Sequence, residues 1–145
     1  MDSITIESDR LNLILETPEE VLARIDAMPP ADRAQVSPQW LAQMRAETHA
    51  NPWKHGFRMV DRASRIVVGG CAFKGPPDYH GAVEIAYGVE PEYRQRGYAT
   101  ETAQALVDFA FAHHVRLVRA HTLVNNDASI GVLLNCGFCL IGEVI

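Results

Sequence analysis

The sequence predicts a mixed α/β domain in which a mostly antiparallel central sheet is flanked by helices. Strand-like alternation recurs in short stretches, other stretches place apolar residues at helical spacing, and prolines and glycines punctuate the chain between them. The predicted element order is β-α-α-β-β-β-α-β-α-β. Neither a linker nor an internal repeat divides residues 1–145, so we expect a single domain.

Composition supports a packed core and argues against two classes of function. The 145 residues are 48% hydrophobic and 21% charged, which provides enough apolar material for a core. Thirteen Lys and Arg against eighteen Asp and Glu give a net charge of −5, opposite in sign to that of a typical nucleic-acid-binding protein. The apolar stretches fall far short of the ~20 residues of a membrane span, and the first residues lack a signal peptide's pattern. We therefore expect a cytoplasmic protein that binds neither nucleic acid nor a membrane.

In the first half of the chain, local patterns predict one strand and two helices. Leucines alternate with other residues over 11–15, which is typical of a strand. Thr17 stands where the N-cap of a capping box belongs, and a helix follows over 18–28. A second helix is expected to begin at Ser37-Pro38 and to end at Asn51-Pro52.

In the second half, the periodicity changes to that of strands. Three strands, expected over 53–60, 66–73 and 83–89, are separated by turn residues and form an antiparallel meander. A long helix follows, with apolar residues at helical spacing from Ala99 to Ala110. The remaining elements are a strand over 117–123, a short helix over 129–136 capped by Gly137, and a last strand over 138–144.

The cysteines are expected to be reduced and to bind no metal. Their number, three, does not suit a disulfide framework in a chain of this size. Cys136-Gly137-Phe138-Cys139 spells C-x-x-C, but it straddles a helix C-terminus, where the helix dipole disfavours a thiolate. No second pair completes a zinc site.

The most informative stretch joins the strand over 83–89 to the long helix. Gly97 and Ala99 are small where a ligand could approach closely, and the N–H groups at a helix N-terminus attract anions. A pyrophosphate group would suit this loop. Composition alone leaves open an ordinary strand-to-helix turn in which Arg94 and Arg96 are simply solvated.

Two motifs resemble those of the GNAT superfamily, the acetyl-CoA-dependent N-acetyltransferases. The first is Arg94-x-x-Gly97-x-Ala99, which matches the family pattern Gln/Arg-x-x-Gly-x-Gly/Ala between a strand and a helix. The second is Asn126-x-x-Ser129, which matches a further family element and is followed at the expected distance by Gly-Phe. Because the two motifs are independent and occur in the right order, the match is specific.

The resemblance extends to nearly the whole chain. Residues 7–13 and 84–89 are similar to the branch that contains the ribosomal-protein N-terminal acetyltransferases of the Rim type. This resemblance implies an enzyme that transfers an acetyl group from acetyl-CoA to a primary amine by direct attack in a ternary complex. The acceptor, a small molecule or a protein N-terminus, is not written in the sequence.

The resemblance also implies which residues bind acetyl-CoA. Backbone groups of Tyr87, Gly88 and Val89 are expected to pair with the pantetheine arm, and Asn126 to hydrogen-bond it. A plain helix N-cap is the alternative role for Asn126. The loop that holds the pyrophosphate through backbone amides consists of Arg94, Gln95, Arg96, Gly97, Tyr98, Ala99 and Thr100.

Three side chains are candidates for proton transfer. Ser129 matches the residue proposed in the Rim branch to protonate the departing thiolate, whereas Leu133 stands where many relatives have a tyrosine acid. Either Ser129 serves as the acid or the thiolate leaves unassisted, because a thiol with a pKa of ~8.5 is a fair leaving group. Glu84 and His121 are alternatives for the general base, because relatives carry catalytic carboxylates at these strand positions. Structural roles stay open for all three: Ser129 in the first turn of a helix, Glu84 facing solvent and His121 within a strand.

A non-catalytic acyl-CoA-binding or sensing module of the same fold is the second class of function. The missing tyrosine favours it, as does the end of the sequence at residues 142–145, because relatives of this branch continue with a further strand. An open sheet edge there would invite a partner edge, as in a homodimer, or leave the acceptor site incomplete. Amine-dependent release of the coenzyme thiol separates the enzyme from the module.

Overall fold

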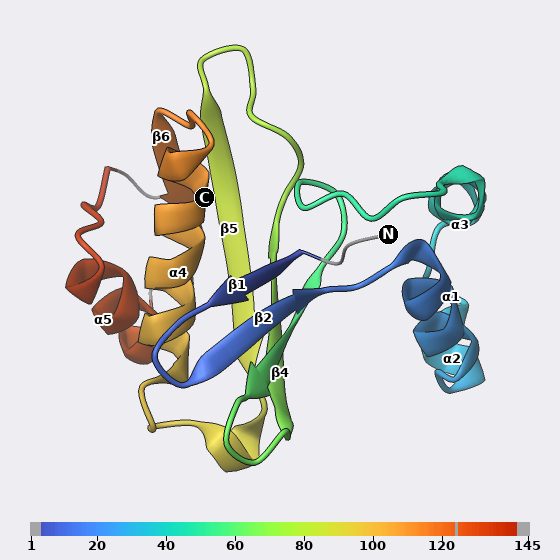
Figure 1. The fold of residues 1–145 in the computed structure, drawn as a ribbon, viewed down its shortest axis with the longest axis horizontal. Helices are drawn as coiled ribbons and strands as arrows, with labels where there is room; N and C mark the ends of the chain where they lie inside the picture. The colour runs from blue at the N-terminus through green and yellow to red at the C-terminus, as the bar shows by residue number, and fades with distance from the viewer. Residues whose placement is uncertain (1–3, 124, 142–145) are drawn as a thin grey trace.

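One mostly antiparallel sheet organises the fold of residues 4–123 and 125–141, which the computed structural model describes (Figure 1). Its strands lie in the order β1-β2-β3-β4-β5-β6, and every neighbouring pair is antiparallel except β5 and β6, which are parallel. The strands are β1 (Thr5–Glu7), β2 (Leu11–Leu15), β3 (Phe57–Asp61), β4 (Val67–Phe73), β5 (Ala82–Val89) and β6 (Leu117–Ala120). The predicted fold class and the meander of β3, β4 and β5 are confirmed.

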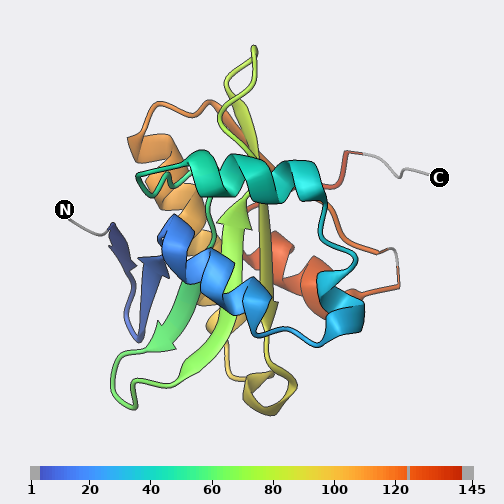
Figure 2. The same cartoon turned by 90° about the vertical axis from the view of Figure 1, so that its right-hand side faces the viewer.

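Helices lie on both sides of the sheet, as Figures 1 and 2 show. One side carries α4 and α5, the other carries α1, α2 and α3, and a 3-10 turn, η1, leads from β5 to α4. The bounds are α1 (Pro18–Asp26), α2 (Pro30–Arg33), α3 (Pro38–Ala46), η1 (Pro91–Tyr93), α4 (Tyr98–Ala112) and α5 (Asp127–Asn135). None of these helices combines the length and the apolar character that crossing a membrane requires.

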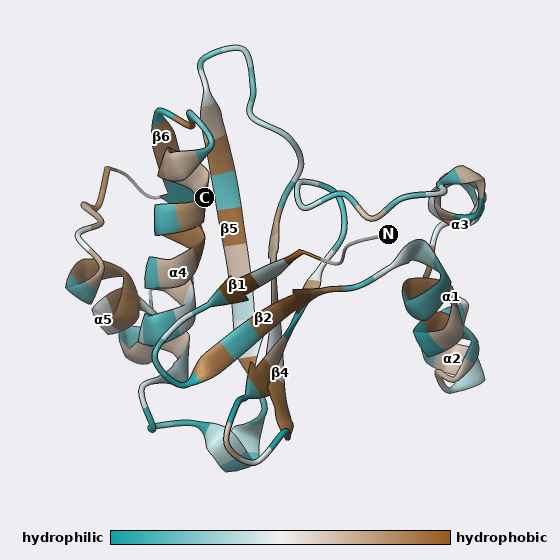
Figure 3. Ribbon diagram, viewed as in Figure 1, coloured by the Kyte–Doolittle hydropathy of each residue, from teal (hydrophilic) through white to brown (hydrophobic). Residues whose placement is uncertain are grey.

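The main core lies between the sheet and α4. Leu11, Leu13 and Leu15 of β2 are buried while the residues between them are half-buried, as the alternation of leucines predicts. Figure 3 shows β2 as largely brown with one teal band, because Asn12 is hydrophilic whereas Ile14 is hydrophobic. Ala103 and Leu106 of α4 pack against this face, so α4 is fixed to the sheet along its apolar side.

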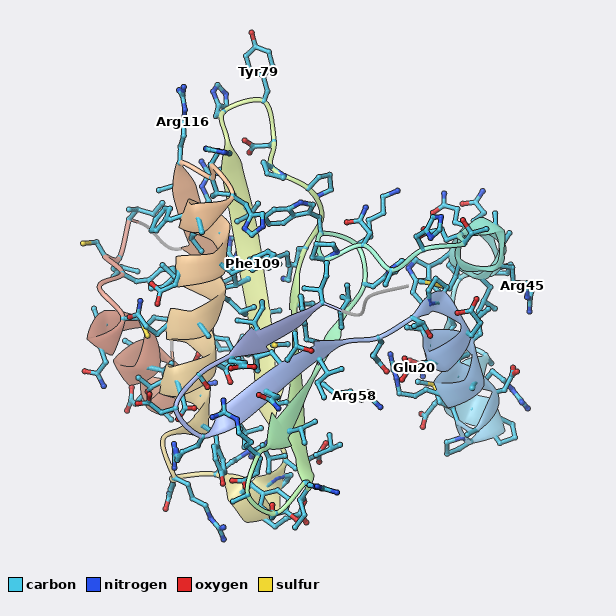
Figure 4. All side chains as sticks on the ribbon, in the orientation of Figure 1. Glu20, Arg45, Arg58, Tyr79, Phe109 and Arg116 are labelled. Atoms are coloured by element: carbon cyan, nitrogen blue, oxygen red, sulfur yellow. The ribbon has the colours of Figure 1, made fainter. Side chains whose placement is uncertain are left out.

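A second, smaller core holds the first helices together. Val21 and Ile25 of α1 pack against Met44 of α3, separately from the main core. An ion pair of 3.3 Å between Glu20 of α1 and Arg58 of β3 connects this layer to the sheet (Figure 4). The helices α1 and α3 therefore form a layer of their own beside the sheet.

Two predicted helix caps are confirmed. Thr17 Oγ1 accepts a hydrogen bond from the Glu20 amide at 3.1 Å, and the Glu20 carboxylate accepts one from the Thr17 amide at 3.2 Å, which completes the capping box. After α5, Gly137 adopts a φ of +88°, and the amide of Phe138 donates to the carbonyl of Leu133. This left-handed cap requires glycine, because a side chain at such a φ is strained.

Several predicted boundaries are wrong. The strand expected from residue 53 begins at Phe57, because Asn51 Oδ1 accepts the Trp53 amide at 2.8 Å and bends the chain into a turn. Helix α3 ends at Ala46, since the backbone becomes extended at Glu47. The strand expected over 117–123 stops at Ala120, where its pairing with β5 ends.

The last predicted strand is wrong for the part of it that the structure describes. Residues 138–141 form no strand: after the reversal at Gly137, Phe138 packs against the main core, whereas Leu140 and Ile141 are exposed. Residues 142–144 lie outside the described residues. The structure instead adds two short elements that the sequence patterns did not predict, β1 and α2.

Candidate active site

β5 extends beyond its pairing with β6, and we call the unpaired stretch between the two strands the wedge. The parallel pairing of the two strands ends at Ile85 and Ala120, whereas β5 continues to Val89. The carbonyl of Glu84 and the amide of Glu90 both bond to β4, so the backbone groups of the alternate residues face the other way. Tyr87 and Val89 therefore turn their backbone groups toward the open wedge.

The loop after β5 delivers the chain to the N-terminus of α4. Gln95 and Gly97 have φ values of +64° and +84°, so the loop is tightly wound. Gly97 is the N-cap of α4 and has no side chain to accept from the first-turn amides. The N–H groups of Tyr98, Ala99 and Thr100 thus remain available to an anion.

The Tyr98 side chain anchors this helix end. Its hydroxyl donates to Asp61 Oδ2 at 2.7 Å, and the guanidinium of Arg10 lies 4.6 Å from its ring centroid. The hydrogen bond from Tyr98, together with the amide of Ser64, lowers the pKa of Asp61 from 3.8 to about 2. Only the backbone of Tyr98 is therefore free for the role in coenzyme binding that the sequence suggests.

The loop arginines fold back onto the main chain. Arg94 Nε donates to the carbonyl of Val89 at 2.9 Å, and Arg96 donates to the carbonyl of Glu92 at 3.3 Å. The Val89 carbonyl is thereby occupied, while the amide of the same residue still faces the wedge. Both side chains are nevertheless exposed, so an ordinary strand-to-helix turn with solvated arginines stays open beside the coenzyme loop.

Sequence reasoning missed a third arginine beside the loop. Arg10 follows the turn after β1, and its Nε bonds to Glu101 at 2.8 Å. A Cβ added to Gly97 would lie 3.3 Å from Arg10 Nη2, so this guanidinium borders the N-terminus of α4. The unpredicted strand β1 places it there, and only a prediction of the β1–β2 hairpin could have revealed it.

The two candidate bases, Glu84 and His121, are brought together. His121 Nδ1 lies 2.9 Å from one carboxylate oxygen of Glu84, and Lys74 Nζ lies 2.7 Å from the other. Burial alone would raise the pKa of Glu84, but the hydrogen bonds from Lys74 and His121 outweigh it and lower the pKa. Sequence reasoning found two members of this cluster separately and missed Lys74.

Ser129 and Asn126 lie at the start of α5. Asn126 Oδ1 accepts the Ser129 amide at 3.1 Å, so Asn126 does serve as an N-cap, and its side-chain NH₂ group is not used in that bond. The Ser129 hydroxyl lies 3.4 Å from the hydroxyl of Tyr87. Residues from β5 and α5 thus meet on the α5 side of the wedge.

A groove of about 360 Å³ lies between α3 and the end of β4. Its lining includes Trp40 and Met44 of α3 and Phe73 and Lys74 of the β4 end. Lys74 connects it to Glu84, so the groove approaches the Glu84 and His121 pair from the α3 side of the sheet. Within residues 4–123 and 125–141, no group of three or more His, Cys, Asp or Glu side chains could hold a metal ion.

Comparison with known proteins gives a family match. Residues 4–139 match the family model described as the acetyltransferase (GNAT) domain. An uncharacterized N-acetyltransferase of Bacillus subtilis, YjdG, is 35% identical over 83 residues, which is 57% of this chain. The match spans about half of that relative, 49% of its length.

Solved structures share the fold. The ribosomal-protein-S5-alanine acetyltransferase of Vibrio fischeri superposes with a TM-score of 0.71 at 16% identity, over 97% of this chain and 86% of that one. The dodecameric spermidine N-acetyltransferase of Vibrio cholerae superposes with a TM-score of 0.67 at 16% identity, over 93% of this chain and 82% of that one. The microcin C7 self-immunity acetyltransferase in complex with acetyl-CoA and AMP superposes with a TM-score of 0.62 at 15% identity, over 92% of this chain and 81% of that one. Because the family model covers nearly all the described residues, this chain belongs to the GNAT acetyltransferase family.

Proposed function

We propose that this protein transfers the acetyl group of acetyl-CoA to a primary amine, which attacks the thioester directly in a ternary complex. The observation that carries the proposal is the wedge between β5 and β6, open beside the unblocked N-terminus of α4. Free strand amides and a helix N-terminus suit the two polar parts of coenzyme A, its pantetheine arm and its pyrophosphate. Membership of the GNAT family supports acetyl transfer as the reaction.

In this proposal, coenzyme binding uses main-chain groups and one side-chain donor. The amides of Tyr98, Ala99 and Thr100 hold the pyrophosphate, and Arg10, whose charge is paired with Glu101 through Nε, offers Nη2 as a further donor beside them. The pantetheine arm lies along the wedge side of β5 and pairs with its free backbone groups. The NH₂ group of Asn126 faces no cap partner and is free to donate to the same arm.

The general base in this proposal is His121, and Glu84 positions it. The bonds from Lys74 and His121 lower the pKa of Glu84. Glu84 is therefore a weaker base, because a lower pKa means that its carboxylate binds a proton less readily. With Nδ1 of His121 turned to Glu84, Nε2 is the ring nitrogen left to accept a proton from the amine. The side chain of His121 is 62% exposed, so an incoming acceptor can reach it.

An acceptor amine of low pKa suits this arrangement. Deprotonating a lysine amine with a pKa near 10.4 at pH 7 costs about 4.6 kcal/mol, whereas an α-amine with a pKa near 8 costs about 1.4 kcal/mol. A histidine is a strong enough base to help deprotonate the α-amine. We therefore propose an α-amine, of a small molecule or of a protein N-terminus, as the acceptor class.

Thiol release with a panel of amines tests the proposed function. The purified protein is incubated with acetyl-CoA and either peptides with free N-termini, the same peptides with blocked N-termini, or diamines, while free coenzyme thiol is measured. Thiol release that requires a free α-amine supports the proposal. Binding of acetyl-CoA without amine-dependent thiol release contradicts it and favours the non-catalytic module.

A further inference from the structure

The leaving thiolate lies on one side of the sheet and the base on the other, if the proposed function holds. Successive residues of a strand point to opposite faces, so Tyr87 and Glu84, three positions apart, face opposite sides. The Tyr87 hydroxyl reaches α5, whereas Glu84 pairs with Lys74 beside the α3 groove. Neither Glu84 nor His121 is therefore placed to protonate the sulfur.

Tyr87 lies where the thioester would stop. A coenzyme that enters at the N-terminus of α4 and follows β5 inward from Val89 meets the closed end of the wedge at Ile85. Tyr87 is the last residue before that end whose backbone groups face the wedge. Its phenol is half-buried, and its hydroxyl lies 3.4 Å from Ser129 Oγ. Burial raises the pKa of the phenol, so it stays protonated at neutral pH.

No other tyrosine of the chain is available at this place. Leu133, where many relatives have a tyrosine acid, is buried in the core. The chain has four tyrosines, and Tyr79 projects from the tip of the β4–β5 hairpin (Figure 4). Tyr93 lies beneath Arg96, and Tyr98 is bound to Asp61 at the far end of the loop. Tyr87 is thus the tyrosine whose hydroxyl reaches the first turn of α5, at Ser129.

We propose that the Tyr87 hydroxyl is the acid that protonates the departing coenzyme A thiolate, with Ser129 as its hydrogen-bond partner. When the tetrahedral intermediate collapses, the C–S bond breaks, its electron pair goes to sulfur, and the Tyr87 proton follows to give the free thiol. His121 accepts the proton that the ammonium form of the acceptor loses before attack and passes it to solvent. As the amide forms, the nitrogen loses a second proton to water, and the Tyr87 phenolate regains a proton from water through Ser129. Of the two protons that leave the acceptor, one therefore replaces the proton given to sulfur and one goes to solvent.

Kinetics of Tyr87→Phe test this proposal, which rests on the proposed function. The substitution keeps the ring and removes only the hydroxyl. We expect kcat to fall about 10²-fold or more, while KM for acetyl-CoA and the melting temperature stay near those of the wild type. Tyr79→Phe removes a hydroxyl from the hairpin tip and serves as the matched control, with kcat unchanged.

The partner role of Ser129 is tested by the double variant. If the two hydroxyls act as one unit, Tyr87→Phe with Ser129→Ala loses about as much activity as Tyr87→Phe alone, and independent losses that multiply contradict the partnership. A Tyr87→Phe protein with wild-type kcat, or one whose whole loss lies in KM, overturns the proposal while the proposed function stands. A wild-type protein that releases no thiol with any amine overturns both.

Discussion

Gly97 decides how closely an anion can approach the N-terminus of α4. Its φ of +84° strains any side chain, and a Cβ added there would lie 3.3 Å from Arg10 Nη2, which would have to shift. We predict that Gly97→Val abolishes the thermal stabilisation by coenzyme A, which for the wild type amounts to about 2.7 kcal/mol at about 100 times Kd. Gly75→Val is the matched control, because Gly75 also has a positive φ, +104°, but a Cβ there meets open space. An undiminished shift in Gly97→Val removes the phosphate loop from the coenzyme site.

Glu84 and His121 have unequal roles in the mechanism that we propose. We predict that His121→Ala lowers kcat by about 10²–10⁴-fold, whereas Glu84→Gln, which still accepts a hydrogen bond from the ring, lowers it by about 10-fold or less. Steady-state kinetics at saturating acetyl-CoA measure both. The reverse order of the two losses makes Glu84 the base, and no loss in either means that the amine enters already neutral.

Sequence patterns identified chemistry at single residues but not the contacts between them. Glu84 and His121 were each predicted as candidates from their strand positions, yet nothing local indicates that β5 and β6 pair in the register that joins them. Lys74 was missed because a single lysine after a strand has no pattern. Tyr87 was predicted for its backbone alone, since its side-chain partner on α5 lies 42 positions further along the chain.

At the scale of elements, a hydrogen bond from Tyr98 connects the start of α4 to Asp61 at the end of β3, and this bond depends on pH. The Tyr98 bond, together with the bonds from Ser64 and Ala63, lowers the pKa of Asp61 from 3.8 to about 2, so these bonds stabilise the folded protein fully above about pH 4 and their contribution is lost as the pH falls toward about 2. We predict that the melting temperature of Asp61→Asn falls less steeply than that of the wild type across this window. Tyr98→Phe removes only the Tyr98 bond and leaves the amide bonds to Asp61, so its slope should lie between the other two. Parallel slopes in all three proteins contradict the assignment.

Elements with strong local signals were predicted well, and those defined by tertiary pairing were not. The capping box of α1 and the glycine cap of α5 are encoded in a few adjacent residues. In contrast, β1 is three residues long and exists because it pairs with β2. The end of β6 at Ala120 likewise depends on where β5 diverges, which no window of sequence contains.

At the scale of the whole molecule, the separate core of α1 and α3 predicts uneven stability. Three buried side chains, Val21, Ile25 and Met44, hold this layer, whereas α4 packs along its length on the main core. We predict that amides of α1 and α3 exchange with deuterium faster than those of the middle of α4. Hydrogen exchange with mass spectrometry measures this, and equal protection of the helices contradicts a separate layer.

The overall class followed from the sequence because alternation, helical spacing and turn residues agree along most of the chain. What the patterns did not contain is which side of the sheet each helix covers. That arrangement separates Tyr87 from Glu84 and leaves the groove beside Lys74. The candidate site therefore has groups on both faces of the sheet. The separation of these groups is visible only in the whole fold.

The hairpin of β1 and β2 has a practical consequence for recombinant work. Ser8 and Arg10 both bond to Glu101, in the first turn of α4, the helix that we propose to hold the coenzyme phosphates. On that proposal, removing the first ten residues, or fusing a bulky purification tag close to them, disturbs coenzyme affinity through residues more than ninety positions away from Glu101. Preparations of this protein intended for kinetics are best made with these residues intact.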